Sequence, residues 1–274
     1  MIARTNTTPE QRCREVGYNY NAQHKEPVTH CTFCGSSEQR QLATRDRYGF
    51  HARSVQCRGC GLVFLSPRLT PDGYEDFYCN WYRKLVSAYH NRRINAETIE
   101  AEQLCYAESW CNWAAPYIEK GGEVLDIGGS TGVIASEFTR RFKTHATIID
   151  PSPDECERAQ ARGHDTFCGI AEDADMSAGG WSMVTMFQTI DHLLEPGVVL
   201  MGAVDALPSG GIMLVDIVDL DRVSERVVIT GAIKIDHPFY FTRATAEMMW
   251  GSLDLVTCRL KIVGDHVRYI LRKP

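Results

Sequence analysis

Residues 123–138 read EVLDIGGSTGVIASEF. An apolar run ends at Asp126, a turn with three glycines spans 128–132, and a helical pattern follows. In open α/β sheets, such a turn lies at the carboxyl end of a strand, where ligands bind. The turn is not G-x-G-x-x-G, and no Gly-Lys-Ser/Thr follows it, so it is not a phosphate-binding P-loop. The stretch therefore predicts an α/β fold with a ligand-binding turn after a strand.

Outward from this stretch, strand-like and helix-like runs alternate. The runs typical of strands are EVLDI, HATIID, DTFC, WSMVTMFQ and GIMLVDIV, with helical patterns among them. This alternation predicts a parallel sheet with helices on both faces. The end of the chain differs, because LVTCRLKIV at 255–263, Gly264-Asp265 and HVRYILRK at 266–273 predict a hairpin. We therefore expect a Rossmann-like α/β sheet of seven strands that closes with an antiparallel hairpin.

The composition is that of an ordinary globular protein. The 274 residues are 44% apolar, which is enough for a sizeable core in one large domain or in a domain with a small module. The net charge of −6 gives no support to nucleic-acid binding driven by bulk charge. No apolar signal region opens the chain and no run is long enough to span a bilayer. We expect a cytoplasmic protein without a membrane partner, and nothing in the pattern indicates an oligomeric state.

Two copies of Cys-x-x-Cys-Gly form the clearest metal-binding pattern. CTFCG occupies 31–35 and CRGCG occupies 57–61. Each copy places two thiolates on a tight turn, and together they supply four soft ligands in a tetrahedral array, which suits zinc better than iron. A site closed by four thiolates is structural, because no position is left for water. The predicted Zn²⁺ ligands are Cys31, Cys34, Cys57 and Cys60, and the other seven cysteines show no ligand spacing.

Two aspartates narrow the choice of ligand for the glycine turn. A carboxylate at Asp126 would repel a pyrophosphate and would favour a ligand with an ammonium and a sulfonium group, as in S-adenosylmethionine. Asp150 ends the next strand, in TIIDPS. An acid at that place accepts ribose hydroxyls, in NAD as well as in S-adenosylmethionine. The two acids together favour S-adenosylmethionine.

The order VLDIGGSTG, IIDPS, MFQTIDHLLEP and terminal hairpin resembles the class I S-adenosylmethionine-dependent methyltransferases over about residues 121–274. The resemblance implies that one group of residues lies at the methionine part of the cofactor, a second at the ribose, and a third at the adenine and the fourth strand. These are Asp126, Gly128, Gly129, Ser130 and Gly132; Asp150 and Pro151; and Ala171, Glu172 and Gln188. The chain departs from the family pattern at Ile170, where many members have an acid, and Glu172 or a backbone carbonyl would substitute.

The N-terminal half resembles the zinc-binding lead-in of bacterial methyltransferases that act in deoxysugar, polysaccharide and natural-product pathways. The residues that carry this likeness are CTFCG, CRGCGLVFLSPRLTPDGYEDFY and the tyrosines after them. The sugar C-methyltransferases also have a further C-terminal domain, whereas this chain stops at the hairpin, so O- or N-methylation fits equally well. We expect four parts: a flexible lead-in (1–27), a zinc-ribbon-like cysteine module (28–68), a helical linker and substrate lid (69–118), and a methyltransferase domain (119–274).

Two Asp-His pairs are candidates for the base that a hydroxyl or carbon nucleophile needs. Asp191-His192 follows the fourth strand, where the substrate should meet the methyl group. Asp236-His237 lies in IKIDHPFYFT, a loop that also resembles the methyltransferases named above. A carboxylate can orient a histidine and raise its basicity. We favour His237, with Asp236, over His192, which could instead cap the following helix.

Aromatic and basic residues are candidates for substrate contact. Tyr74, Tyr78 and Tyr82 recur every fourth residue and therefore share one helix face. We expect Tyr74 to pack, and Tyr78, Tyr82 and the loop residue Tyr240 to contact substrate. Five arginines of the cysteine module could bind substrate phosphate. They are Arg45, Arg47, Arg53, Arg58 and Arg68.

Three functions fit these patterns. The first is methylation of a small molecule, such as a sugar, a nucleotide-activated sugar or a glycan or natural-product intermediate. The second is methylation of RNA, with the cysteine module on the phosphate backbone, although the net charge and the lack of an Asn-Pro-Pro-Tyr-type motif after the fourth strand argue against it. The third is a zinc-ribbon binding module on an inactive fold. Salt-dependent binding would favour RNA.

Overall fold

The computed structural model describes residues 7–177 and 179–274. Its centre is a seven-stranded sheet in the order β12-β13-β10-β9-β6-β7-β8. Neighbours from β10 to β8 are parallel, whereas β13 is antiparallel to both β10 and β12. The strands are β6 (Glu123–Ile127), β7 (His145–Asp150), β8 (Asp165–Cys168), β9 (Trp181–Phe187), β10 (Ile212–Val218), β12 (Val256–Val263) and β13 (His266–Arg272). The predicted α/β sheet with a terminal hairpin is confirmed.

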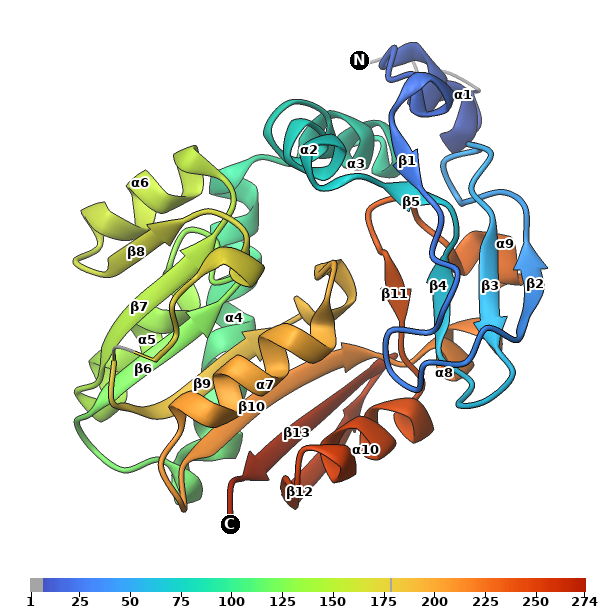
Figure 1. Cartoon of the computed structure of the whole chain (residues 1–274). Helices are drawn as coiled ribbons and strands as arrows, with labels where there is room; N and C mark the ends of the chain where they lie inside the picture. The colour runs from blue at the N-terminus through green and yellow to red at the C-terminus, as the bar shows by residue number, and fades with distance from the viewer. Residues whose placement is uncertain (1–6, 178) are drawn as a thin grey trace.

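Helices cover both faces of this sheet (Figure 1). One face packs against α4 (Ala96–Ala114), α5 (Val133–Phe142) and α6 (Pro153–Ala161), and the other against α7 (Pro196–Ala206) and α10 (Arg243–Ser252). The strand interiors are apolar on both faces, as parallel sheets require. Short helical turns lie at the loops: η3 (Ala115–Tyr117), η4 (Ala171–Asp173), η5 (Ile190–His192), α8 (Leu220–Ser224) and α9 (Ile229–Ala232).

The cysteine module forms a second, four-stranded antiparallel sheet in the order β11-β4-β3-β2. Three strands belong to the module: β2 (Gln39–Ala43), β3 (Ser54–Cys57) and β4 (Val63–Leu65). The fourth, β11 (Phe239–Tyr240), comes from the part of the chain that forms the seven-stranded sheet, and it pairs with β4. The module and the large domain therefore share one sheet, and the strand that they share directly follows the Asp236-His237 pair.

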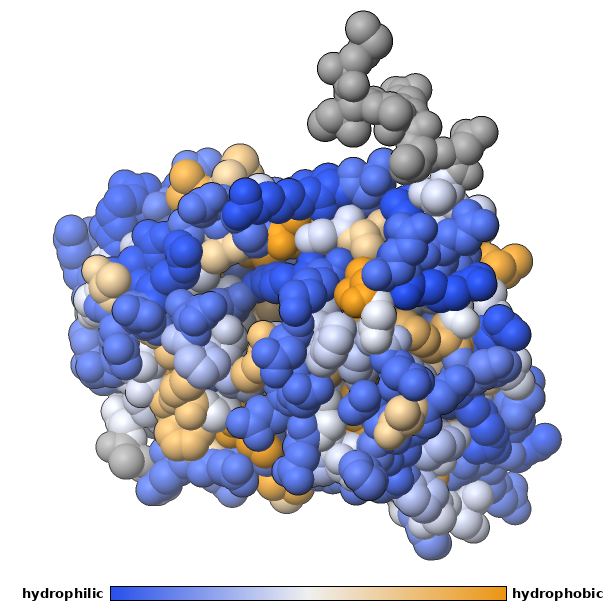
Figure 2. Space-filling view, turned by 90° about the horizontal axis from the view of Figure 1, so that it is seen from above, coloured by the Kyte–Doolittle hydropathy of each residue, from blue (hydrophilic) through white to orange (hydrophobic). Residues whose placement is uncertain are grey.

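The linker forms α2 (Pro71–Asp76), the π-helical turn η2 (Phe77–Trp81) and α3 (Tyr82–His90), which lead into α4. Thr70 caps α2 by accepting the Gly73 amide, and Pro71 occupies the first turn, where proline is favoured. Seen from above, the face that carries α2, α3 and α6 is mainly hydrophilic, with scattered hydrophobic residues and a hollow near its middle (Figure 2). Among the described residues, no helix is both long and apolar enough to cross a membrane.

The N-terminal segment differs from the flexible lead-in expected for 1–27, of which 1–6 lie outside the described residues. It contains α1 (Pro9–Glu15), η1 (Tyr20–Ala22) and β1 (Lys25–Glu26), which pairs with β5 (Arg68–Leu69). A capping box between Thr8 and Gln11 starts α1. Cys13, Tyr18 and Tyr20 are buried in the core beneath the linker. Apolar burial at a few positions therefore orders a segment whose sequence is mostly polar.

Candidate active site at the sheet edge

The glycine turn lies where the strand order reverses. β6 has β7 on one side and β9 on the other, and such a switch point forms the ligand crevice of open α/β sheets. Gly128 and Gly132 have φ angles of 75° and 76°, and Ser130 has 52°. A Cβ atom at Gly128 would overlap Thr189, and one at Gly132 would overlap His164. The glycines therefore allow the turn to lie close against neighbouring loops.

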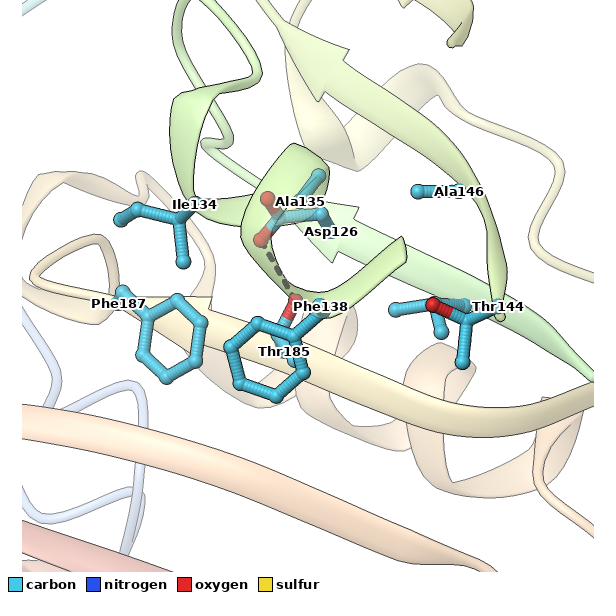
Figure 3. Close-up of a pocket in the computed structure, with 9 residues that line it drawn as sticks. Asp126, Ile134, Ala135, Phe138, Thr144, Ala146, Thr185 and Phe187 are labelled. Atoms are coloured by element: carbon cyan, nitrogen blue, oxygen red, sulfur yellow. Dashed lines mark hydrogen bonds between the residues drawn. The ribbon is translucent and has the colours of Figure 1, made fainter. Parts of the chain in front are cut away.

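Asp126 lies beneath this turn and not at its surface. Its side chain points into the interface between the sheet and α5, where Phe138 and Phe187 help to close a space too small for water (Figure 3). The carboxylate accepts a 2.6 Å hydrogen bond from the Thr185 hydroxyl. Burial raises the pKa of Asp126 to about 6, although the Thr185 hydrogen bond opposes this. The sequence predicted that Asp126 contacts a positively charged ligand at the surface. In the structure Asp126 is buried and supports the turn from below.

Asp150 ties the turn to the next strand. One carboxylate oxygen accepts the Ser130 amide at 3.0 Å, and the other accepts the Ser152 amide at 2.9 Å. Burial, with a contribution from Glu155, raises the pKa of Asp150 to about 7 against these two hydrogen bonds. Glu155 in turn pairs with Arg83 of the linker. Asp150 therefore lies at the crevice edge, under the linker, as the sequence predicts for an acid at the end of β7.

The three residues expected near the adenine and the fourth strand differ in burial and in their contacts. Ala171 is buried. Glu172 directs one carboxylate oxygen to the backbone amides of Leu194 and Glu195, at 2.7 and 3.0 Å, and thereby satisfies free N–H groups just before α7. The sequence suggested that Glu172 replaces the acid that many members of the family have at the position of Ile170. Here this carboxylate oxygen of Glu172 instead binds the backbone before α7. Gln188 is exposed after β9.

Three polar atoms around the glycine turn have no hydrogen-bond partner in the described residues. They are Asp126 Oδ2, Ser130 Oγ and Thr131 Oγ1. Buried polar groups without partners cost folding free energy and are rare in native structures. Asp126 Oδ2 faces the closed space beneath the turn and Thr131 is fully buried, whereas Ser130 is only partly buried. The turn therefore fits a polar ligand that would supply a partner to the Ser130 hydroxyl.

The two Asp-His pairs, which the sequence presented as competing sites, form one cluster. His237 Nδ1 lies 2.7 Å from Asp191 Oδ2, and His237 Nε2 lies 3.5 Å from Asp236 Oδ2. The rings of His192 and His237 are 4.3 Å apart. The cluster lies beside the carboxyl end of β9, since η5 carries one pair and the loop before β11 carries the other. The fold thus brings all four candidate residues to one place.

Hydrogen bonds define the protonation of His192. Tyr78 has one hydroxyl hydrogen and lies 2.8 Å from the Asp236 carbonyl oxygen and 2.6 Å from His192 Nδ1. A carbonyl oxygen can only accept, so the Tyr78 hydroxyl donates to it. His192 Nδ1 must therefore carry a hydrogen and donate to the Tyr78 oxygen. In neutral His192, the free lone pair is then on Nε2.

His237 is more fully satisfied. Its Nδ1 donates to Asp191, and its Nε2 lies 2.9 Å from Lys234 Nζ. A charged ammonium group has no free lone pair, so Lys234 donates and Nε2 accepts. Burial lowers the pKa of His237 to about 4 despite the opposing charge of Asp191, and the Lys234 charge lowers it further. His237 is therefore neutral at pH 7 with both ring nitrogens engaged. The sequence did not single out Lys234, since a lysine in a loop is usually solvated.

Three groups of this cluster, Asp191, His192 and His237, have ligand atoms within 4.8 Å of one another. Such a set could hold a metal ion. The Lys234 ammonium, however, lies 2.9 Å from His237 Nε2 and would repel a divalent cation there. The Asp191–His237 distance of 2.7 Å is that of a hydrogen bond. The cluster is therefore arranged for proton handling.

The tyrosines expected at the substrate have different surroundings. Tyr78 and Tyr82 are partly buried, and their ring centroids are 5.4 Å apart on the linker face towards the cluster. Tyr74 is buried and packs, as expected. Tyr240 is also buried, and its hydroxyl donates to the Lys234 carbonyl and accepts the Lys234 amide, both at 2.6 Å. Tyr240 thus holds the loop, which differs from the expected substrate contact.

The four cysteines of the doubled motif converge as the spacing predicts. Their sulfur atoms lie within 4.8 Å of one another, with Cys31–Cys60 and Cys34–Cys57 both at 3.5 Å. A tetrahedral zinc with Zn–S bonds of about 2.3 Å requires sulfur atoms roughly 3.8 Å apart. The Gly59 amide donates to Cys57 Sγ at 3.3 Å. The donor set and spacing therefore fit Zn²⁺.

The comparisons agree with this architecture. A family model described as "Methyltransferase domain" matches residues 99–256, more than half of the chain. The chain belongs to this methyltransferase family. No curated protein matches the chain. The family and the fold together make the protein an S-adenosylmethionine-dependent methyltransferase.

Solved structures share the fold at low sequence identity. Magnesium protoporphyrin IX methyltransferase of Synechocystis PCC 6803, with bound S-adenosylhomocysteine, has a TM-score of 0.55 at 10% identity, covering 73% of this chain and 98% of that chain. A Pyrococcus horikoshii OT3 protein has a TM-score of 0.54 at 18% identity, covering 63% and 91%. An S-adenosylmethionine-dependent methyltransferase of Methanosarcina mazei has a TM-score of 0.50 at 13% identity, covering 59% and 96%. At these identities the likeness concerns the fold alone.

Proposed function

We propose that the protein methylates a small, hydroxyl-rich acceptor, such as a sugar, a nucleotide-activated sugar or a glycan or natural-product intermediate. The observation that carries the proposal is the joined Asp-His cluster beside the crevice, walled by the linker tyrosines. Asp191 Oδ1 and Asp236 Oδ1 are buried and have no donor among the described residues, so the cluster has more hydrogen-bond acceptors than donors. Carboxylates accept hydrogen bonds from hydroxyl groups, which a sugar supplies in number. The net charge of −6 argues against RNA.

His192 is the proposed base. Its Nε2 carries the free lone pair, because Nδ1–H is committed to Tyr78, and it can take the proton of an attacking acceptor hydroxyl. His237 is the positioning residue, since Asp191 and Lys234 occupy its two ring nitrogens. This assignment reverses the preference that the sequence suggested. A general base must first lie within hydrogen-bond reach of the proton that it takes with a free lone pair, and only then does its pKa matter.

S-adenosylmethionine supplies an electrophilic methyl group when it is bound. The chain residues proposed to hold it are Ser130 and the glycine turn at the methionine part, Asp150 with Pro151 at the ribose, and Gln188 beside the fourth strand. Asp126 supports the turn. Ala171 and the backbone after β8 border the adenine. Enclosure by the linker would exclude water and align the acceptor, which is the main task of the protein in a direct displacement.

The cysteine module is proposed to hold one structural Zn²⁺ through Cys31, Cys34, Cys57 and Cys60. The support is the convergence of four thiols at nearly tetrahedral spacing with no position for water or substrate. The ion would take no part in the chemistry. Its role would be to fix the module that forms one wall of the acceptor site.

The test uses methyl-labelled S-adenosylmethionine and extract of the native host, separated into small molecules, glycans, RNA and protein. Label in sugars or glycans is expected, and label confined to RNA would overturn the proposed substrate class. With the labelled fraction as acceptor, His192→Gln should lower kcat about 10²–10³-fold. His237→Gln should lower it less. Full turnover of the His192 variant with loss in the His237 variant would move the base to His237.

A further inference from the structure

Two cations border the Asp-His cluster without a carboxylate partner. Arg47 lies in the loop between β2 and β3, and Lys234 lies between α9 and β11. Within the described part of the chain, neither forms an ion pair within 4.0 Å, whereas Arg68 and Arg83 do. Both residues are partly buried, so their charges are partly removed from water. Cations that are partly desolvated and unpaired favour an anionic ligand.

Arg47 is held in a fixed orientation. Its backbone amide donates to the Ile233 carbonyl at 2.9 Å, which attaches the module loop to the residue before Lys234. Its guanidinium lies over the Tyr89 ring at 4.6 Å and the Tyr48 ring at 5.1 Å. One Nη donates to the Tyr48 hydroxyl at 3.3 Å, and Nε has no acceptor in the described residues. Nε is buried, so it is the second Nη group, which forms no hydrogen bond within the described residues, that remains for an oxyanion, in a plane fixed by aromatic stacking.

Lys234 joins this group to the cluster. Tyr240 holds the Lys234 backbone from both sides, and Nζ lies 2.9 Å from His237 Nε2. Burial lowers the pKa of Lys234, and the Arg47 charge lowers it further. The pKa of Asp236 is lowered even though burial raises it, because His237, Lys234, His192 and Arg47 favour its charged form. The two cations are therefore close enough to act on the same groups.

The other arginines that the sequence suggested for phosphate binding are placed differently. Arg68 is buried against Glu26 and Glu195. Arg53 donates to the Ser66 carbonyl. Arg45 and Arg58 are exposed, and within the described residues neither contacts the cluster. Arg47 alone combines an orientation fixed by stacking with proximity to the cluster.

We propose that Arg47 and Lys234 bind an oxyanion of the methyl acceptor, a phosphate or a carboxylate, and thereby orient the nucleophile towards His192. The inference rests on the proposed function and narrows its substrate class to acidic small molecules, such as a nucleotide-activated sugar or a sugar acid. Arg47 supplies a planar fork and Lys234 a point charge, a combination that suits an oxyanion with several acceptor atoms.

The test is calorimetric titration of the full-length, zinc-loaded protein with uridine diphosphate, inorganic pyrophosphate and glucuronate. Each titration is made with and without saturating S-adenosylhomocysteine. Wild type should bind at least one of the three anions. Arg47→Gln and Lys234→Gln should weaken that binding at least tenfold, which corresponds to the loss of one charged hydrogen bond. Arg47→Lys should weaken it less, because it keeps the charge and loses the fork.

Arg45→Gln is the matched control, since Arg45 is exposed two positions away, and it should leave anion affinity unchanged. Uridine diphosphate and pyrophosphate binding would indicate a phosphate source, and glucuronate binding a carboxylate source. Absence of anion binding in wild type, or equal binding in wild type and the Arg47 and Lys234 variants, would overturn the inference. Failure to bind S-adenosylhomocysteine would instead overturn the proposed function, and the titration without it would still report on the two cations.

Discussion

At the residue scale, Asp126 shows how one buried carboxylate can support a binding turn without reaching the ligand surface. It is 1% exposed and shares its hydrogen bond with Thr185 of the neighbouring strand. Burial raises its pKa from 3.8 to about 6. A carboxyl group whose pKa rises on folding destabilises the folded state as the pH increases from about 4 to about 6. At pH 7 this rise corresponds to about 3 kcal/mol.

Asp126→Asn should therefore increase the unfolding free energy at pH 7 by about 1–2 kcal/mol. The gain is smaller than the full electrostatic term, because the buried amide also needs a partner. The variant's advantage should shrink as the pH falls from 6 to 4 and should reverse near pH 4, where wild-type Asp126 is protonated in the folded state and mainly the cost of the buried amide remains. Urea unfolding across this range measures it. A variant less stable at pH 7 would contradict the argument.

The same variant tests how Asp126 serves the cofactor. If Asp126 only supports the turn, S-adenosylhomocysteine affinity should fall less than about tenfold, since the Thr185 hydrogen bond can persist to the amide oxygen. A larger loss at unchanged stability would favour the direct carboxylate contact that the sequence suggested. Titration calorimetry separates the two outcomes.

Residue types at the site could be predicted from the sequence, but their partners could not. Asp-His adjacency predicted two separate sites, whereas the pairing runs across them, from His237 to Asp191. Tyr78 could be assigned to the site from helical spacing, yet its contact with His192 depends on how the linker folds over β9. Lys234 carries no local signal at all. Side-chain hydrogen bonds depend on tertiary placement, which sequence spacing does not determine.

At the element scale, β11 couples the two parts of the chain. It pairs with β4 of the cysteine module, and the Leu65 amide donates to the Pro238 carbonyl at 2.9 Å. Pro238 directly follows His237. The module sheet therefore positions the histidine loop, and the order of that loop should depend on the four cysteines.

Cys34→Ser should remove the bound zinc, loosen the module sheet and lower turnover at least tenfold. Zinc content by mass spectrometry should fall from about one equivalent to near zero, and amide exchange of 239–241 should accelerate. S-adenosylhomocysteine affinity should change little, because the glycine turn lies in the other sheet. Cys105→Ser, at an exposed position on α4, is the control. Wild-type protein without stoichiometric zinc would contradict the metal assignment.

The order of the elements could largely be predicted, because strand and helix periods alternate clearly after residue 121. The pairing of β11 with the module sheet could not be predicted, because a strand of two residues is too short to show an alternating pattern. The short helix α1 also could not be predicted from hydrophobic periodicity, because its sequence is mostly polar. Its signal was the capping pair Thr8 and Gln11, and its stability comes from the burial of Cys13 and the following tyrosines.

At the scale of the whole molecule, Arg68 joins the cysteine module to the sheet domain. It is 6% exposed and binds Glu26 at 2.9 Å and Glu195 at 2.8 Å, and it also donates to the Leu194 carbonyl. Glu172 satisfies the amides of the same loop. This loop follows the proposed base His192, so the junction also fixes one side of the acceptor site.

Arg68→Met should lower the unfolding free energy by about 2–4 kcal/mol, because removal of a buried charged partner leaves the Leu194 carbonyl unsatisfied. The loss stays at the lower end because Glu26 and Glu195 are 39% and 43% exposed and can turn to water. Arg92→Gln, which breaks an exposed pair with Glu102, is the control and should leave the unfolding free energy nearly unchanged, because water screens that pair. Urea unfolding measures both. In the Arg68 variant, tryptophan fluorescence and zinc release should separate into two transitions, since the junction that couples module and sheet is weakened. A single unchanged transition would show that the shared strand β11 alone couples the two parts.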